Sequence, residues 1–214
     1  MNTDPTIMNP KATKKSVVKH FDGEFYTKYL SKGYDLAIRL TGWYKNVGKH
    51  ALEGIPPCAM LDVGCGTGFI MDMARKKGFN VKGIDPSEGM IDKAIEKYGF
   101  TKDEICQTTA DKLPYSDESF DFVFASGSLI YVPNMVDTVT EMSRVLKIGG
   151  TLRVLDHSTP KKKSLLTPLV FLFTQASGYL IHDYEFYFSK HLKLVKHKTV
   201  GRAGYMQLFD FKKV

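Results

Sequence analysis

Three glycines at alternate positions follow an apolar run in the segment "AMLDVGCGTGFI", residues 59–70, and a helical pattern begins directly after them. Gly64, Gly66 and Gly68 allow the backbone to approach a ligand without a Cβ atom in the way and to adopt positive φ angles. The helix that follows offers unpaired N–H donors in its first turn. Ligands of an open parallel sheet bind outside the carboxyl ends of its strands. The segment therefore predicts an α/β sheet with a ligand site at the end of its first strand.

Apolar runs of five to eight residues alternate with helical patterns along the chain, which is typical of βαβ units around a parallel sheet. The expected strands are residues 58–64, 80–85, 104–111, 120–128 and 151–158, followed by an antiparallel edge hairpin at 191–200 and 205–214. Helices are expected at 67–78, from the cap residue Ser87 to Tyr98, and at 134–146, with Gly149 closing the last. The sequence thus predicts an α/β fold, a doubly wound, mostly parallel sheet of seven strands with a C-terminal antiparallel hairpin.

The length of 214 residues suits one domain with one core. Residues 1–20 are expected to form a flexible N-terminal arm, and residues 21–214 a single domain. Within that domain, residues 21–55 are expected to form N-terminal helices, which either pack by an aromatic face or cover the sheet as a lid. Residues 165–181 are the longest apolar stretch, but Thr, Pro, Gln and Ser interrupt it, so we do not expect it to cross a membrane.

The net charge of +7 comes from the C-terminal third, because residues 1–150 carry 19 Lys and Arg against 19 Asp and Glu, whereas residues 151–214 carry 11 against 4. This third is either a solvated lysine face or a surface for peripheral contact with an anionic membrane. No nucleic-acid partner is expected, since no Arg-rich or aromatic-interleaved run accompanies the lysines. The three cysteines lack metal-ligand spacing and the N-terminus lacks an apolar signal segment, so we expect no metal and a cytoplasmic location.

The glycine pattern and two aspartates favour a nucleoside-bearing ligand. The spacing is G-x-G-x-G, and Phe69 occupies the position where a dinucleotide fingerprint has its last glycine. Asp85 ends the second strand, where a carboxylate can accept hydrogen bonds from ribose hydroxyls, although a turn residue before Pro86 would look the same. Asp111 follows the third strand and is either a partner for an adenine amino group or a solvated loop acid.

Four segments in order, "LDVGCGTG", "GIDPSEGM", "ADKLPYSDESFD" and "EMSRVLKIGGTLRVLDHS", closely resemble the class I S-adenosylmethionine-dependent methyltransferases over residues 60–158. The residues of these segments are similar to those of the branch that contains the ubiquinone/menaquinone C-methyltransferases and their small-molecule relatives. The resemblance implies the Rossmann-like methyltransferase fold, S-adenosyl-L-methionine as cofactor, and methyl transfer to a small-molecule or lipid-like acceptor, with quinone-type acceptors included.

The resemblance also implies roles for single residues. The cofactor's methionine part would lie against Asp62 and the loop from Gly64 to Gly68, its ribose against Asp85, its adenine against Ala110 and Asp111, and its methyl-bearing sulfur beside Ser126. The further positions expected to line the cofactor are Cys65, Pro86, Met90 and Lys112. Tyr34 would belong to the lid and could shield the sulfonium through a cation–π contact.

The segment after the fourth strand departs from the quinone-methylating enzymes. Those enzymes typically carry Arg-Asn there, whereas this chain has "ASGSLIYV" with Leu129, Ile130 and Tyr131. This difference weakens the case for quinol C-methylation and leaves the expected cofactor unchanged.

Two residues are candidates for catalysis. His157 follows the fifth strand and either acts as a general base or orients its loop, and Tyr131 either lines the acceptor pocket or packs under the next helix. His182 and Asp183 adjoin the apolar stretch and could equally be surface residues. Residues 158–190 are expected to be a variable insertion on the acceptor side, whose apolar part would cover a hydrophobic acceptor or pack in the core.

Other functions stay open at this point. The same fold could methylate a phospholipid amine or a small thiol, or the chain could be a non-catalytic subunit that binds S-adenosylmethionine. RNA methylation is not expected, because no "NPPY"-type segment follows the fourth strand. The sequence does not predict an oligomeric state.

Overall fold

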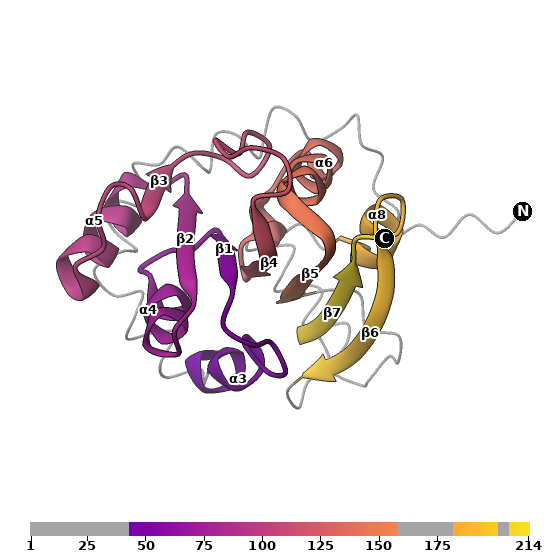
Figure 1. The fold of residues 1–214 in the computed structure, drawn as a ribbon, viewed down its shortest axis with the longest axis horizontal. Helices are drawn as coiled ribbons and strands as arrows, with labels where there is room; N and C mark the ends of the chain where they lie inside the picture. The colour runs from indigo at the N-terminus through magenta and orange to yellow at the C-terminus, as the bar shows by residue number, and fades with distance from the viewer. Residues whose placement is uncertain (1–42, 158–181, 201–205) are drawn as a thin grey trace, which may run out of the picture.

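A seven-stranded sheet forms the centre of the computed structural model, which describes residues 43–157, 182–200 and 206–214, with side chains from residue 47 onward (Figure 1). The strands are β1 (Ala59–Val63), β2 (Asn80–Asp85), β3 (Ile105–Gln107), β4 (Phe120–Ser126), β5 (Leu146–His157), β6 (Lys193–Val200) and β7 (Met206–Lys212). Their order is β3-β2-β1-β4-β5-β7-β6, and the first five in this order are parallel. β7 is antiparallel to both β5 and β6. The predicted fold, including the C-terminal hairpin, is confirmed.

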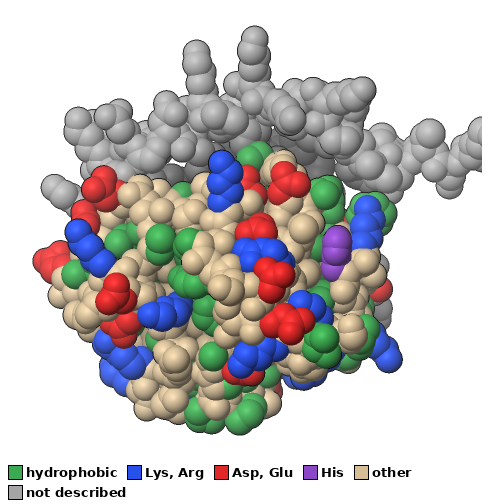
Figure 2. Space-filling view, turned by 45° about the horizontal axis from the view of Figure 1, so that its top comes forward, with side chains coloured by type: hydrophobic (Ala, Val, Ile, Leu, Met, Phe, Trp, Pro, Cys, Tyr) green, Lys and Arg blue, Asp and Glu red, His purple; other side chains and the backbone are tan. Residues whose placement is uncertain are grey.

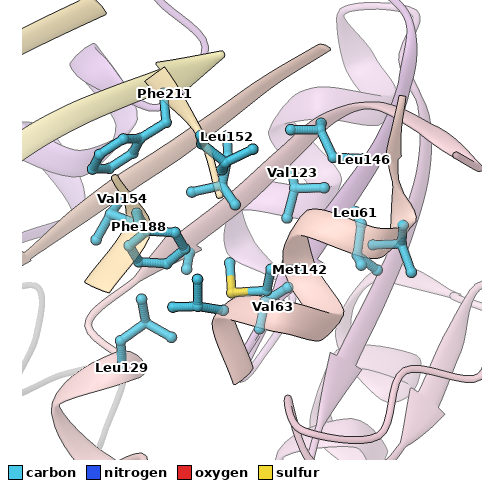
Figure 3. Close-up of a cluster of buried hydrophobic side chains, with 14 of the residues drawn as sticks. Leu61, Val63, Val123, Leu129, Met142, Leu146, Leu152, Val154, Phe188 and Phe211 are labelled. Atoms are coloured by element: carbon cyan, nitrogen blue, oxygen red, sulfur yellow. The ribbon is translucent and has the colours of Figure 1, made fainter. Parts of the chain in front are cut away.

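Helices cover both faces of this sheet, so the inner strands are buried on both sides. The helices are α3 (Trp43–His50), α4 (Phe69–Lys76), α5 (Glu88–Tyr98), the 3₁₀ turn η3 (Leu129–Tyr131), α6 (Met135–Val145) and α8 (Tyr184–Phe188). In β4, Phe122 and Phe124 pack in the cluster that contains residues of α3, α4 and α5. Val123 packs in the opposite cluster with Met142 of α6 and Phe188 of α8, as Figure 3 shows.

Two expected element boundaries are wrong. The strand expected at 104–111 is shorter, because β3 ends at Gln107 and a loop follows. Gly149 does not close the helix before the fifth strand: α6 ends at Val145, and Leu146 already pairs with Phe120 as the first residue of β5. Gly149 has a φ of 76° inside β5, where its N–H donates to the Lys213 carbonyl. Gly149 therefore allows an irregular backbone conformation inside β5 and does not end a helix.

The edge strand β6 carries part of the positive charge of the C-terminal third, with Lys193 and Lys196 exposed. On the face drawn in Figure 2, acidic and basic side chains are interspersed. No helix within the described ranges combines the length and hydropathy needed to cross a membrane. The apolar stretch 165–181 and the lid residue Tyr34 lie outside the described residues.

A buried ion pair ties α3 to the middle of the sheet. Arg153 of β5 is 2% exposed, and its Nε and Nη2 donate to the two carboxylate oxygens of Asp210 on β7 at 2.6 and 2.8 Å. Its Nη1 donates to the carbonyls of His50, Ala51 and Glu53 at 2.9 to 3.0 Å. These carbonyls lie at and just beyond the C-terminus of α3, where helical partners are missing. One guanidinium thus satisfies a buried carboxylate and a helix end together.

We expect Arg153→Met to lower the free energy of unfolding by about 3–5 kcal/mol, because it leaves the Asp210 carboxylate buried without its cation. Urea denaturation measures the change. The matched control is Lys147→Met, which breaks the half-exposed pair between Lys147 and Asp121 (2.8 Å) and should cost less than about 1 kcal/mol. Equal losses in the two variants would contradict the assigned role of Arg153.

Candidate active site

The glycine loop lies at the carboxyl end of β1, packed against two neighbouring strands. The N–H groups of Gly64 and Cys65 donate to the Ile84 carbonyl of β2 at 2.8 and 3.0 Å. On the other side, the Ser128 hydroxyl, just after β4, donates to the Val63 carbonyl at 2.8 Å. A Cβ atom on Gly64 would lie 2.2 Å from the Ser128 Cβ, so only glycine fits there.

The other two loop glycines face different surroundings. Gly68 has a φ of 79° at the N-terminus of α4, and a Cβ on it would lie 2.9 Å from the Phe100 ring. Gly66 has a φ of 53°, and a Cβ on it would meet no described atom within 4 Å. Gly64 and Gly68 are therefore explained by packing inside the protein. Gly66 instead leaves room for a ligand at the backbone, and this open position fits the predicted cofactor.

Asp85, the last residue of β2, holds this loop. Its Oδ2 accepts the Gly66 N–H and its Oδ1 accepts the Ser87 N–H, both at 2.9 Å. Burial raises the pKa of Asp85 although the two N–H donors act to lower it. Each carboxylate oxygen keeps a second lone pair, so it can still accept a hydroxyl. Ser87 occupies the predicted cap position, but its own hydroxyl makes no capping hydrogen bond.

A second carboxylate is buried beside the loop. Asp62 is 2% exposed in β1, and burial together with the charge of Asp85 raises its pKa to about 8. The neighbouring thiol of Cys65 is also buried, and its pKa is raised well above the usual value, first by burial and then by the two aspartates. A raised pKa means that these groups hold their protons more readily than usual, and a nearby cation would favour their ionised forms.

The residues expected to contact adenine lie in the loop after β3. Ala110 and Asp111 are half-buried, and Lys112 is exposed. Glu141 of α6 accepts the Leu113 N–H at 2.9 Å, and Arg144 donates to the Leu113 carbonyl at 3.1 Å. The loop that carries Asp111 is therefore fixed to α6. Two further candidates differ in exposure, since Met90 is buried in α5 whereas Pro86 is exposed.

Ser126, predicted beside the cofactor's methyl group, and the catalytic candidates His157 and Tyr131 lie at or just after the ends of β4 and β5, which are adjacent in the sheet. Ser126 is the last residue of β4, and its hydroxyl is buried. His157 is the last residue of β5, with Nδ1 3.8 Å from Oδ1 of Asp156. Tyr131 is half-buried in η3, directly after β4. The structure therefore gathers all three at one edge of the sheet.

Two further polar residues lie at this edge. No role was predicted for Asp156 from the sequence, and it was left open whether His182 is a surface residue. Asp156 is fully buried as the penultimate residue of β5, and it lies in the last of the four quoted segments. His182 is half-buried, and burial lowers its pKa, so it is not a surface residue. Asp183 is exposed and accepts the Phe186 N–H at 3.0 Å as the cap of α8.

The described residues contain no group of three or more His, Cys, Asp or Glu side chains that could hold a metal ion.

Comparisons with known proteins agree with this geometry. The family described as "Methyltransferase domain" matches residues 61–154. The demethylmenaquinone methyltransferase of Bacillus velezensis is 36% identical over 108 residues, which cover 47% of this chain and 46% of that protein. The ubiquinone/menaquinone biosynthesis C-methyltransferase UbiE of Campylobacter jejuni is 28% identical over 207 residues, covering 86% of this chain and 84% of the relative.

Solved structures show the same fold. Geranyl diphosphate C-methyltransferase from Streptomyces coelicolor, in complex with Mg²⁺, geranyl diphosphate and S-adenosyl-L-homocysteine, has a TM-score of 0.64 and is 19% identical, covering 81% of this chain and 77% of that one. The match to the first curated relatives spans less than half of their length.

Residues 61–154 match the methyltransferase-domain family, so the predicted resemblance to the class I S-adenosylmethionine-dependent methyltransferases is confirmed over these residues. The two curated relatives named above are methyltransferases of menaquinone or ubiquinone, which is the predicted branch. The comparisons support S-adenosyl-L-methionine as the cofactor. The roles of the individual site residues stay predictions.

We expect Gly66→Ala to weaken binding of S-adenosylhomocysteine roughly tenfold or more, because the new methyl group would enter the ligand's space. Gly99→Ala is the matched control, since Gly99 also has a positive φ (67°) and nothing within 4 Å of a Cβ, but it ends α5. Both variants should lose about 1–2 kcal/mol of stability from backbone strain. Calorimetry measures the two affinities. An equal affinity in both variants would show that the ligand does not lie against Gly66.

We expect binding of S-adenosylmethionine at pH 7 to release a proton, on the order of one per site, from Asp62. Its pKa of about 8 keeps the carboxyl protonated at pH 7 in the free protein, and a bound cation favours the ionised form. Affinity should therefore rise with pH up to about 8 and then level off. Calorimetry in buffers of different ionisation enthalpy counts the proton. Asp62→Asn should release none, and identical release from both proteins would contradict this assignment.

Proposed function

We propose that this chain is an S-adenosylmethionine-dependent methyltransferase that acts on a small-molecule or lipid-like acceptor. The observation that carries the proposal is the pairing of Gly66, whose Cβ position is open, with the Asp85 carboxylate that bonds its N–H. A carboxylate at the end of β2 and a glycine backbone at the end of β1 form one face for a nucleoside. The matches to methyltransferases support the same conclusion.

The residues present suit this cofactor. Asp85 would accept the ribose hydroxyls with its remaining lone pairs, and Asp111 would accept the adenine amino group from its fixed loop. Asp62 would stabilise the positive charge of the methionine part. When bound, S-adenosylmethionine supplies a methyl group on a positively charged sulfur. The chain's residues bind and orient the two partners in line and exclude water, which accounts for most of the acceleration in such a displacement.

The acceptor is proposed as a class. The quinone methyltransferases among the relatives favour an aromatic, lipid-like acceptor. In this chain, the segment after β4 offers the half-buried Tyr131 beside the buried Leu129 and Ile130, in place of the Arg-Asn expected for quinol enzymes. We therefore propose the wider class of small or lipid-like acceptors, in which a quinol is one member.

A transfer assay tests the proposal. The protein is incubated with methyl-labelled S-adenosylmethionine and extract of the source cells, which is then divided into organic, small aqueous and macromolecular fractions. We expect label in the organic or the small aqueous fraction. Asp85→Ala should reduce both cofactor affinity and transfer roughly tenfold or more, because a lost contact to a buried charged group costs about 1.5–3 kcal/mol.

Each other outcome of this assay contradicts part of the proposal. Label in the macromolecular fraction alone would overturn the acceptor class. Measurable cofactor binding with no transfer into any fraction would favour a non-catalytic binding subunit.

A further inference from the structure

A buried polar cluster lies at the carboxyl ends of β4 and β5, apart from the glycine loop. Its members are Asp156 at the end of β5, His157 next to it, and His182 and Tyr184 at the start of α8. Asp156 and Tyr184 are both 0% exposed. The register pairs Ser126 of β4 with Leu155, so Asp156 lies one residue beyond the partner of Ser126. The cluster therefore adjoins the residue expected beside the methyl group.

Asp156 is fixed by backbone donors from two segments. Its Oδ2 accepts the Leu129 N–H at 3.0 Å, and its Oδ1 accepts the His157 N–H at 2.7 Å. The first bond fixes η3, the segment that follows Ser126 in the chain, to the end of β5. A fully buried carboxylate held by two N–H donors therefore has a fixed position on the acceptor side.

His182 lies near both this carboxylate and η3, because both act on its imidazole. Burial lowers the pKa of its imidazole, while the Asp156 charge and the backbone carbonyls of Val132 and Leu129 act to raise it. Its ring centroid is 6.1 Å from that of Tyr184 and 6.0 Å from that of Tyr187. Burial and Asp156 raise the pKa of Tyr184 well above its usual value, so this phenol stays neutral. The Asp156 carboxylate is the acidic group that acts on the His182 imidazole.

We propose that His182 accepts the proton of the methyl acceptor, with Asp156 as the positioning residue, and that the acceptor therefore carries a weakly acidic hydroxyl such as that of a phenol or hydroquinone. This inference rests on the proposed function. The carbonyls of Val132 and Leu129 orient the ring, and Asp156 stabilises the imidazolium that forms. A thiolate or a free amine would need little help of this kind, so a fixed proton acceptor favours a hydroxyl-bearing acceptor.

The atoms balance in a single displacement. A lone pair of the acceptor, on oxygen or on the ring carbon that the hydroxyl activates, forms the bond to the methyl carbon. The carbon–sulfur bond breaks, and its electron pair remains on the sulfur. The hydroxyl proton of an O-acceptor, or the proton that the activated ring loses, ends on a nitrogen of His182. The imidazolium then returns it to solvent.

His182→Gln is the first test, with His191→Gln as the matched control, because His191 is exposed just beyond α8. Initial rates of label transfer to extract are measured from pH 5 to 9, together with the affinity for S-adenosylhomocysteine and the melting temperature. His182→Gln should lower the rate by roughly 10²–10⁴-fold and remove the acid limb of the pH profile. Affinity and melting temperature should stay near those of the control. Asp156→Asn should lower the rate and shift the acid limb.

The outcomes separate this inference from the proposed function. If the unaltered protein transfers label and His182→Gln stays within about threefold of His191→Gln, His182 is not the proton acceptor and the proposed function stands. If the unaltered protein transfers no label into any fraction, the proposed function fails and the role of His182 fails with it. NMR of ¹⁵N-labelled histidine in the S-adenosylhomocysteine complex gives a readout without turnover. A His182 ring that is neutral at pH 7 supports the inference, and a charged ring overturns it.

Discussion

One carboxylate, that of Asp85, decides the shape of the candidate cofactor site. It accepts the Gly66 N–H from the loop after β1 and the Ser87 N–H that begins the turn into α5. β1 and β2 pair in parallel, with Val63 opposite Ile84. The pairing therefore places Asp85, the residue after Ile84, beside the loop that follows Val63. A buried carboxylate needs such donors, so the loop conformation and the charge of the site depend on each other. Gly64 and Gly68 are required because no Cβ atom fits where the loop meets Ser128 and Phe100.

A second buried carboxylate, near the carboxyl end of β5, also accepts backbone N–H groups from its neighbouring segments. Asp156, the penultimate residue of β5, accepts an N–H from the segment after the neighbouring β4 and another from the residue that follows it in the chain. The two aspartates thus fix the loops on the two sides of the site by the same means. Their surroundings differ: Asp85 lies near a second acidic residue, Asp62, and favours a cation, whereas Asp156 lies near two histidines and favours proton transfer.

Stability is supported largely away from this edge. Arg153 and Asp210 form their pair inside the sheet and bind the end of α3, and the apolar clusters on both faces enclose β1 and β4. The strained and charged groups of the site have positive φ angles at three glycines and include three buried aspartates, Asp62, Asp85 and Asp156. They are supported by an ion pair and apolar clusters that lie mostly outside them. This separation is why substitutions in the two regions should be distinguishable.

The order of strands and helices, the glycine loop and the strand-end Asp85 could all be predicted from the sequence. These features depend on local requirements: a period of apolar residues, positive φ angles, and a polar residue where an apolar run ends. Element boundaries were less accurate where a neighbouring strand decided them, as at Leu146, which joins β5 because it pairs with Phe120. Gly149 was misassigned for the same reason, since a glycine near a helix end looks the same whether it ends the helix or permits an irregular strand.

The sequence by itself determined the class of fold and predicted the cofactor side of the site, because each motif there is short and carries its own backbone requirement. Only the tertiary structure decided the acceptor side. Asp156 lies in the last of the four quoted segments, whereas His182 and Tyr184 lie in none of them, and the three meet because the β4–β5 register and the packing of α8 bring them together. The Arg153–Asp210 pair, 57 residues apart, arises likewise from the pairing of β5 with β7. Contacts between distant segments depend on register and packing, which no local pattern of residues specifies.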